Sequence, residues 1–212
     1  MNLFEYVTQN WQLILSKTGE HVSLAFIAVG LACLVGIPLG VMITKSKKAA
    51  SIVIGIANIM QTIPSLALFA FVIPIIGVGR PNAIFALFLY ALLPIIKNTY
   101  IGLNNVDPAI IEAARGMGMS RAQIMFRVQM PLAVSVIMGG VRIATVTGIG
   151  IATIATLIGA GGLGYLIYQG IGMMNYNLIF SGAIAAALLA LAMDFLLGFF
   201  EKRLTSKGIT QK

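Results

Sequence analysis

Residues 22–44 read VSLAFIAVGLACLVGIPLGVMIT and contain no charged side chain. A helix of about 20 mostly apolar residues crosses the hydrocarbon core of a bilayer, where the backbone must satisfy its own hydrogen bonds. The stretch therefore predicts a transmembrane helix. Other segments meet or approach the same length and apolar character, and they are residues 51–76, 82–103, 131–158 and 177–200.

The composition agrees with a membrane protein. Of 212 residues, 59% are hydrophobic and 9% are charged, and the mean hydropathy is +0.98. Soluble domains carry about 25% charged residues, so we exclude a soluble domain. The net charge of +8 lies in short clusters between apolar stretches, which is typical of a topology signal and predicts no nucleic-acid partner. Cys33 is the one cysteine, so no intramolecular disulfide is expected.

The basic residues predict the orientation, because cytoplasmic loops carry an excess of Lys and Arg. With the N-terminus outside, eleven basic residues are cytoplasmic, Lys17 and Arg80 are external, and Arg142 lies in a span. We therefore expect an all-α integral membrane protein with five transmembrane helices, N-out and C-in. The cytoplasmic residues are Lys45, Lys47, Lys48, Lys97, Arg115, Arg121, Arg127, Lys202, Arg203, Lys207 and Lys212.

The sequence predicts a single membrane domain with a short segment on either side of it. Before it, Phe4, Val7, Trp11 and Ile14 recur at helical spacing, which predicts a short interfacial helix over residues 1–20 with Trp11 at headgroup level; a frayed tail is the alternative. We expect the transmembrane domain over residues 21–203, including a cytoplasmic loop over residues 104–130. A cytoplasmic tail over residues 204–212 completes the chain.

The cytoplasmic loop has the signals of two helices. Asp107 and Pro108 predict a helix start, since an aspartate can cap the free amides and a proline loses nothing at the first position. Gly116 or Gly118 can end that helix with a left-handed residue. Ser120 has capping-box spacing to the residue three positions on, which predicts a second helix leading into the fourth span. The loop should therefore be a rigid object with a glycine hinge.

The stretch EAARGMGMSRAQIMFRVQMP, residues 112–131, resembles the EAA loop of bacterial ABC importer permeases. That pattern is E-A-A, three residues, Gly, nine residues, then Ile-x-Leu-Pro. Val128 and Met130 depart from it but keep its apolar character, and Pro131 closes it. The resemblance implies a coupling helix that seats in a groove of an ATP-hydrolysing partner. The residues expected to make this contact are Glu112, Ala113, Ala114, Gly116, Met117, Gly118 and Met119.

A second resemblance covers more of the chain. The runs QTIPSLALFAFVIPIIGVG and GGVRIATVTGIGIATIATLIGAGGLG, residues 61–79 and 139–164, are similar to the permeases of glycine betaine, carnitine and choline importers. This similarity implies the type I importer core, with a second permease subunit, identical or paralogous, and a separate external substrate-binding protein. It also implies a multi-pass protein of the bacterial cell membrane, where lipid surrounds it.

Two segments could line a translocation path. Pro64 should kink the second span, and the polar residues around it either line the path or pack that helix through hydrogen bonds. In the fourth span, threonines share a helical stripe with Arg142, beside a strip of Ala144, Gly148 and Ala152 suited to close helix contact. The predicted path residues are Asn58, Gln61, Thr62, Ser65, Thr145, Thr153 and Thr156.

Arg142 is costly at membrane depth and should face a partner within the protein. Asp194, on the last span, lies at a comparable depth, so we expect an ion pair that acts either as a structural clamp or as a gate element. Gly159-Ala-Gly-Gly-Leu-Gly164 formally matches G-x-G-x-x-G, but a membrane helix precedes it instead of a strand. We expect Gly161, Gly162 and Gly164 to allow a compact external re-entry of residues 165–172.

These features predict a permease subunit that imports a compatible solute of the glycine betaine, carnitine or choline type. A methionine or other amino-acid importer is the alternative. A secondary transporter is disfavoured, because the spans show no inverted repeat. An enzyme is disfavoured too, because His21 is the sole histidine and no Walker motif is present. We therefore expect no metal or cofactor in this chain, with ATP and Mg bound by the partner ATPase.

Overall fold

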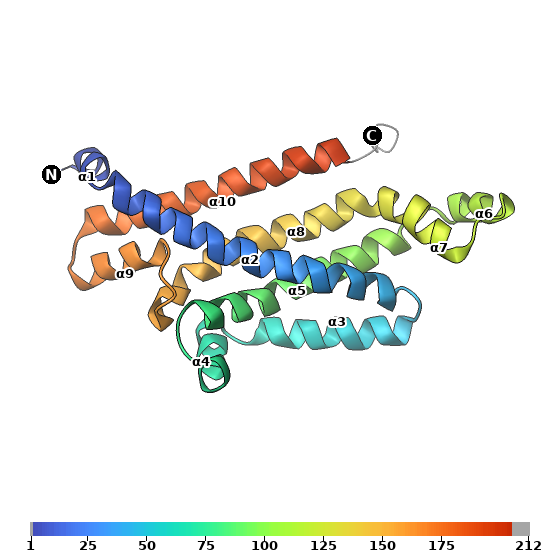
Figure 1. Cartoon of the computed structure of the whole chain (residues 1–212), viewed down its shortest axis with the longest axis horizontal. Helices are drawn as coiled ribbons and strands as arrows, with labels where there is room; N and C mark the ends of the chain where they lie inside the picture. Colours follow the sequence, from blue (N-terminus) through green and yellow to red (C-terminus); the bar gives the residue numbers. More distant parts are fainter. Residues whose placement is uncertain (1, 205–212) are drawn as a thin grey trace.

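The computed structural model describes residues 2–204, and within that range the chain is helical with no strand (Figure 1). Four helical runs of the described chain are long and apolar enough to cross a membrane. They are α2 (Trp11–Ile43), α5 (Arg80–Asn104), the run Arg121–Ala152 that contains α8 (Met130–Ala152), and α10 (Tyr176–Leu204). The prediction of an all-helical protein with several spans is confirmed.

The predicted second span is broken. Its residues form α3 (Lys47–Thr62) and α4 (Ser65–Ile76), whose axes are bent by 101°. The break falls at Pro64, where the sequence predicts a kink, although the bend is far larger than a kink. Asn82 fixes α4 from the neighbouring helix, because its side-chain amide donates to the carbonyls of Phe69 and Gly77 at 3.2 and 2.7 Å.

The centre of the bundle is formed by α2, α5 and α8, which pack closely because small residues face one another. A Cβ on Gly40 of α2 would lie 2.6 Å from Thr99 Cβ of α5. A Cβ on Gly140 of α8 would lie 2.6 Å from the Pro94 carbonyl oxygen of α5. Since real Cβ contacts are never this short, both glycines are required by the distance between the helices. The predicted small strip of α8 is buried here as well.

The molecule is elongated, and its two ends differ (Figure 1). At one end, which we call the α6 end, α6 (Pro108–Gly116) and α7 (Arg121–Ile124) extend beyond the other helices. The opposite end, the α9 end, holds α1 (Leu3–Gln9), α4 and α9 (Gly164–Gly172). The last turn of α10 points toward the α6 end, so α1 and the described end of α10 lie at opposite ends of the molecule.

The N-terminal prediction needs correction in its bounds. α1 ends at Gln9, and α2 begins at Trp11 and continues through the first span to Ile43. Residues 11–20 therefore belong to the first long helix and do not form a separate helix with residues 1–10. The interfacial position of α1 stays a prediction. Of the predicted tail, residues 205–212 lie outside the described residues.

The fourth span also ends earlier than its sequence predicts. α8 stops at Ala152, and Ile154–Ile158 form a 3₁₀ turn before Gly159. No proline follows Ala152, and Gly148 and Gly150 lie within α8 itself, so no local signal predicts that the helix ends here. The start of α9 packs against this point so closely that a side chain on Gly164 would meet the Thr153 carbonyl.

Candidate coupling helix and translocation path

The start of α6 is as predicted. Asp107 Oδ1 accepts a hydrogen bond from the Ala109 amide at 2.8 Å, and Pro108 is the first helical residue. The side chain therefore satisfies one of the amides that a helix start leaves free.

The end of α6 uses Gly118. This glycine is left-handed with φ of +79°, its amide donates to Arg115 O at 2.9 Å, and the Met119 amide donates to Ala114 O at 3.1 Å. These two bonds close the helix as a Schellman motif. The predicted capping box follows, since the Ser120 amide donates to Gln123 Oε1 at 2.7 Å. α6 and α7 are thus two firm helices joined at a glycine.

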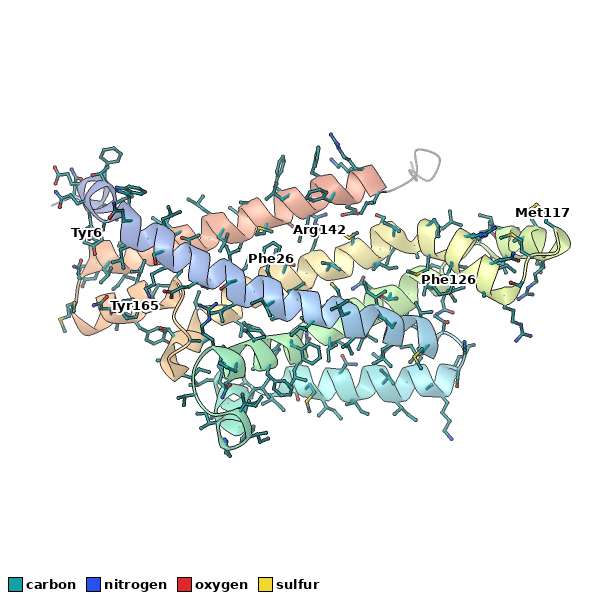
Figure 2. The ribbon with its side chains drawn as sticks, in the orientation of Figure 1. Tyr6, Phe26, Met117, Phe126, Arg142 and Tyr165 are labelled. Atoms are coloured by element: carbon teal, nitrogen blue, oxygen red, sulfur yellow. The ribbon has the colours of Figure 1, made fainter. Side chains whose placement is uncertain are left out.

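The exposed face of α6 contains most of the predicted coupling residues. Glu112, Ala113 and Gly116 are exposed in this subunit, and Met117 is 75% exposed at the tip of the molecule (Figure 2). Ala114 differs, because only 2% of it is exposed. A partner could therefore approach Ala113 closely, while Ala114 seats α6 on its own chain.

A stiff connection joins α6 to the membrane helices. α7 passes into one π-helical turn, Met125–Gln129, and then directly into α8. The Gln129 side-chain amide donates to Leu103 O near the end of α5 at 3.3 Å. The segment after α6 therefore continues into α8 without a loop from Arg121 onward, and Gln129 attaches the start of α8 to α5.

Tyr90 braces the break at Pro64, and the sequence analysis missed it. Its hydroxyl donates to the Ile63 carbonyl, which the break leaves without a helical partner. In return the Gln61 amide donates to Tyr90 O at 3.0 Å, an oxygen whose partner four residues on is Pro94, which has no N–H. The Gln61 amide nitrogen is therefore bound to α5, although the residue is exposed in this subunit, and its place on the path stays a prediction.

The other predicted path residues divide into exposed and buried ones. Asn58 and Thr62 of α3 are exposed, and Ser65 is half-buried at the start of α4. Thr145 is only 4% exposed and donates to Val141 O at 2.8 Å, so its side chain faces the interior of the subunit. Thr153 and Thr156, half-buried, lie beyond α8, and Thr153 donates to Gly150 O at 2.7 Å. The stripe of one long helix that would align these threonines does not exist.

The predicted pair of Arg142 and Asp194 is present and belongs to a larger cluster. Arg142 donates Nε–H to Asp194 Oδ1 at 2.9 Å and Nη2–H to Oδ2 at 3.0 Å. Its Nη1 donates to Glu201 Oε2 at 2.9 Å, and Ser135 donates to Glu201 Oε1 at 2.7 Å. We name Ser135, Arg142, Asp194 and Glu201 the ion cluster. Spacing of seven residues, two helical turns, links Ser135 to Arg142 and Asp194 to Glu201, and this signal could have found them.

A groove runs beside the ion cluster between α8 and α10. One part of about 580 Å³ is lined by Gly139, Ile143, Val146 and Leu191 among others, with Arg142 and Asp194 in its wall. The groove opens on the face of α8 that is exposed in this subunit. The cluster therefore joins two helices at the edge of an open surface and not inside a closed core.

The glycine-rich loop is compact as predicted. Gly159, Gly161 and Gly162 are left-handed, with φ of 78°, 79° and 78°, which L side chains adopt only with strain. Gly164 begins α9, so residues 165–172 are helical, and their external re-entry stays a prediction. No strand precedes the loop within residues 2–204, so the structure gives no support to a dinucleotide site.

Residues 36–206 match the model of a protein family described as binding-protein-dependent transport system inner membrane component. Similar curated proteins include the carnitine transport permease protein OpuCB of Listeria monocytogenes, 46% identical over 97% of this chain and 94% of that protein. The choline transport system permease protein OpuBB of Bacillus subtilis is 44% identical over 98% and 96%. The osmoprotectant import permease protein OsmW of Salmonella typhimurium is 42% identical over 99% and 100%.

Among solved structures, a chain of the MetNI methionine ABC transporter in an inward-facing conformation superposes with a TM-score of 0.83. The match covers 93% of this chain and 99% of that one at 24% identity, so it shows a shared fold alone. The family match over most of the chain, with the relatives above, shows that this chain belongs to the binding-protein-dependent transport system inner membrane components, the permease subunits of ABC importers.

Proposed function

We propose that this chain imports a compatible solute of the glycine betaine, carnitine or choline class, driven by a partner ATPase that binds ATP and Mg. The observation that carries the proposal is α6, a capped helix whose small and apolar residues are exposed at one tip of the molecule and which continues into α8. The names of the similar proteins support the solute class.

The α6 end is proposed to face the cytoplasm. Lys47 at the start of α3, Arg115 and Arg121 beside the coupling helix, and Arg203 near the described end of α10 are basic residues of this end. Lys17 and Arg80 belong to helix segments of the α9 end. This distribution favours N-out and C-in with α3 and α4 together as one broken span, giving five.

The mechanism we propose is alternating access. A loaded external binding protein docks at the α9 end, and a second permease subunit, identical or paralogous, completes the path. ATP-driven closure of the ATPases moves α6, which moves α8 and α5. The solute passes weakly bound beside Asn58, Thr62, Ser65, Thr153 and Thr156, while buried Thr145 and braced Gln61 support the wall.

The coupling role is tested by adding bulk to the exposed face of α6. Ala113→Trp should abolish ATP-driven uptake by the complex reconstituted with its ATPase and binding protein, because the partner can no longer approach that surface. Leu188→Trp, exposed in the middle of α10 and away from both ends of the molecule, is the matched control and should leave uptake within about twofold, as surface changes usually do. Normal uptake by Ala113→Trp would contradict the proposal.

The solute class is tested by competition. Uptake of radiolabelled glycine betaine should be reduced by excess carnitine or choline and unaffected by excess methionine. Competition by methionine, with no effect of the quaternary amines, would assign the chain to amino-acid import instead.

A further inference from the structure

Two adjacent residues of α2 bind two adjacent amides of the glycine-rich loop. Glu20 Oε2 accepts from the Gly162 amide at 2.9 Å, and His21 Nδ1 accepts from the Leu163 amide at 3.2 Å. Each bond joins residues that are 142 positions apart in sequence. The contacts therefore join the first long helix to the loop between α8 and α9.

His21 also contacts α8. It is 0% exposed, and its Nε2 lies 2.9 Å from Ile149 O. Because Nδ1 accepts a hydrogen bond, it has no proton, so Nε2 must be the donor to the carbonyl. The ring is thus neutral in one tautomer and connects the last turns of α8 to the amide that precedes α9.

The loop is shaped to receive these side chains. A Cβ on Gly162 would lie 2.9 Å from His21 Nδ1, and a Cβ on Gly161 would overlap Glu20 Oε2. Both glycines are left-handed, so close approach and backbone conformation both require glycine here. Glu20 is held in turn by Lys17 Nζ at 2.8 Å, and Lys17 lies 4.8 Å from the centre of the Tyr165 ring of α9.

We propose that Glu20 and His21 are positioning residues for the docking surface of the α9 end. They fix the amides of Gly162 and Leu163, and through them the start of α9, in the arrangement that the external binding protein recognises. The inference rests on the proposed function for its docking partner. The hydrogen bonds themselves do not depend on that function, so the positioning role and the proposed function can be tested separately.

Two substitutions each remove one of the two hydrogen bonds of His21 and keep the other. In His21→Asn, the amide oxygen can stand where Nδ1 stands and accept from Leu163, while the bond to Ile149 is lost. In His21→Gln, the amide nitrogen can stand near Nε2 and donate to Ile149, while the acceptor for Leu163 is lost. Both variants replace the ring by an amide, so they form a matched pair.

The measurements are made on the reconstituted complex with its ATPase. Hydrogen exchange of a peptide covering residues 159–165 reports on the loop. The concentration of solute-loaded binding protein that half-maximally stimulates ATP hydrolysis reports on docking. His21→Gln should raise both the exchange rate of the loop and the half-maximal concentration of binding protein by about tenfold, the expected size for a lost partner of one buried amide. The maximal rate of ATP hydrolysis should stay within about twofold. His21→Asn should stay within about threefold of the parent protein for both.

Glu20 supplies a second, independent pair. Glu20→Gln keeps an oxygen for the Gly162 amide and should behave as the parent protein does, whereas Glu20→Leu should behave as His21→Gln does. Equal behaviour of the Asn and Gln variants of His21, or faster loop exchange without a change in the half-maximal concentration, would overturn the positioning role. Absence of any stimulation in the parent complex would overturn the proposed function and the docking role together, while loop exchange would still distinguish the variants.

Discussion

The two ends of α10 are attached to the rest of the molecule by different forces. Near the α9 end, Leu178, Ser181, Gly182 and Ala186 are buried. A Cβ on Gly182 would lie 2.9 Å from Leu166 Cβ and 3.0 Å from Leu163 O. This end is held by close packing, which is short-ranged and depends on volume.

Toward the α6 end the packing stops. Met193 is the last buried residue in the described part of α10. Beyond it, Asp194 and Glu201 bind Arg142 and Ser135 of α8. Charged contacts act over a longer range and are weakened by salt. One end of α10 is therefore attached by close packing and the other by ion pairs to α8. The ion-paired end can move away from α8 without leaving a cavity in a packed core.

The largest expected effect comes from adding one methyl group at the packed end. Gly182→Ala should destabilise the protein by about 3 kcal/mol, because the new Cβ meets a backbone carbonyl and a rigidly held leucine. Gly198→Ala on the same helix is the matched control, since its Cβ would lie 3.3 Å from Arg142 Cζ, so that the end of one long side chain has to shift by only a few tenths of an ångström. It should change stability by at most about 0.5 kcal/mol. Thermal unfolding of the purified protein checks both, and equal losses would remove the contrast between the ends.

A smaller effect should follow from removing the central charge of the ion cluster. Arg142→Met should cost about 1–2 kcal/mol, because two partly exposed carboxylates lose their cation and repel each other. Adding Asp194→Asn and Glu201→Gln to Arg142→Met should restore part of the lost stability. A strictly additive further loss would show that the three residues do not interact.

Salt sharpens this test. Raising the salt concentration from about 0.1 to about 1 M should narrow the stability difference between the parent protein and Arg142→Met. The difference between the parent protein and Gly182→Ala should not change, since packing has no such dependence. A salt effect of the same size on both differences would contradict the assignment of the two forces.

The smallest effect is expected at Ser135. Ser135→Ala removes one hydrogen bond to Glu201, which keeps its bond to Arg142, so the loss should be about 0.5–1 kcal/mol. The same thermal unfolding measurement applies. A loss as large as that of Arg142→Met would mean that Ser135 has a role beyond this bond.

Features set by neighbouring residues were predictable from the sequence. Asp107 with Pro108, and Ser120 with Gln123, act within one helical turn, and both helix starts lie at the predicted positions. The apolar segments were predictable because every membrane helix must be apolar along its length. The pair of Arg142 and Asp194 was predictable because few charged residues within the spans could be partners at that depth.

Features set by contacts between distant segments were not predictable. The end of α8 at Ala152 depends on the approach of α9, which no residue near position 152 reveals. The prediction for Thr145 assumed one helical stripe, and its burial depends on which face of α8 meets α2 and α5. Glu201 was not named from the sequence, although it binds Arg142, and only its spacing from Asp194 hinted at that contact. Glu20 and His21 have no local signal, since their partners lie more than half the chain away.

The brace between Gln61 and Tyr90 makes two prolines on separate helices depend on one another. Pro94 removes the amide that would bind Tyr90 O, and Gln61 supplies the replacement from beside the break that Pro64 creates. Were position 94 to regain an N–H, the helix itself would compete for Tyr90 O, and Gln61 would be released. We therefore expect positions 61, 64, 90 and 94 to covary during evolution, although they belong to different helices.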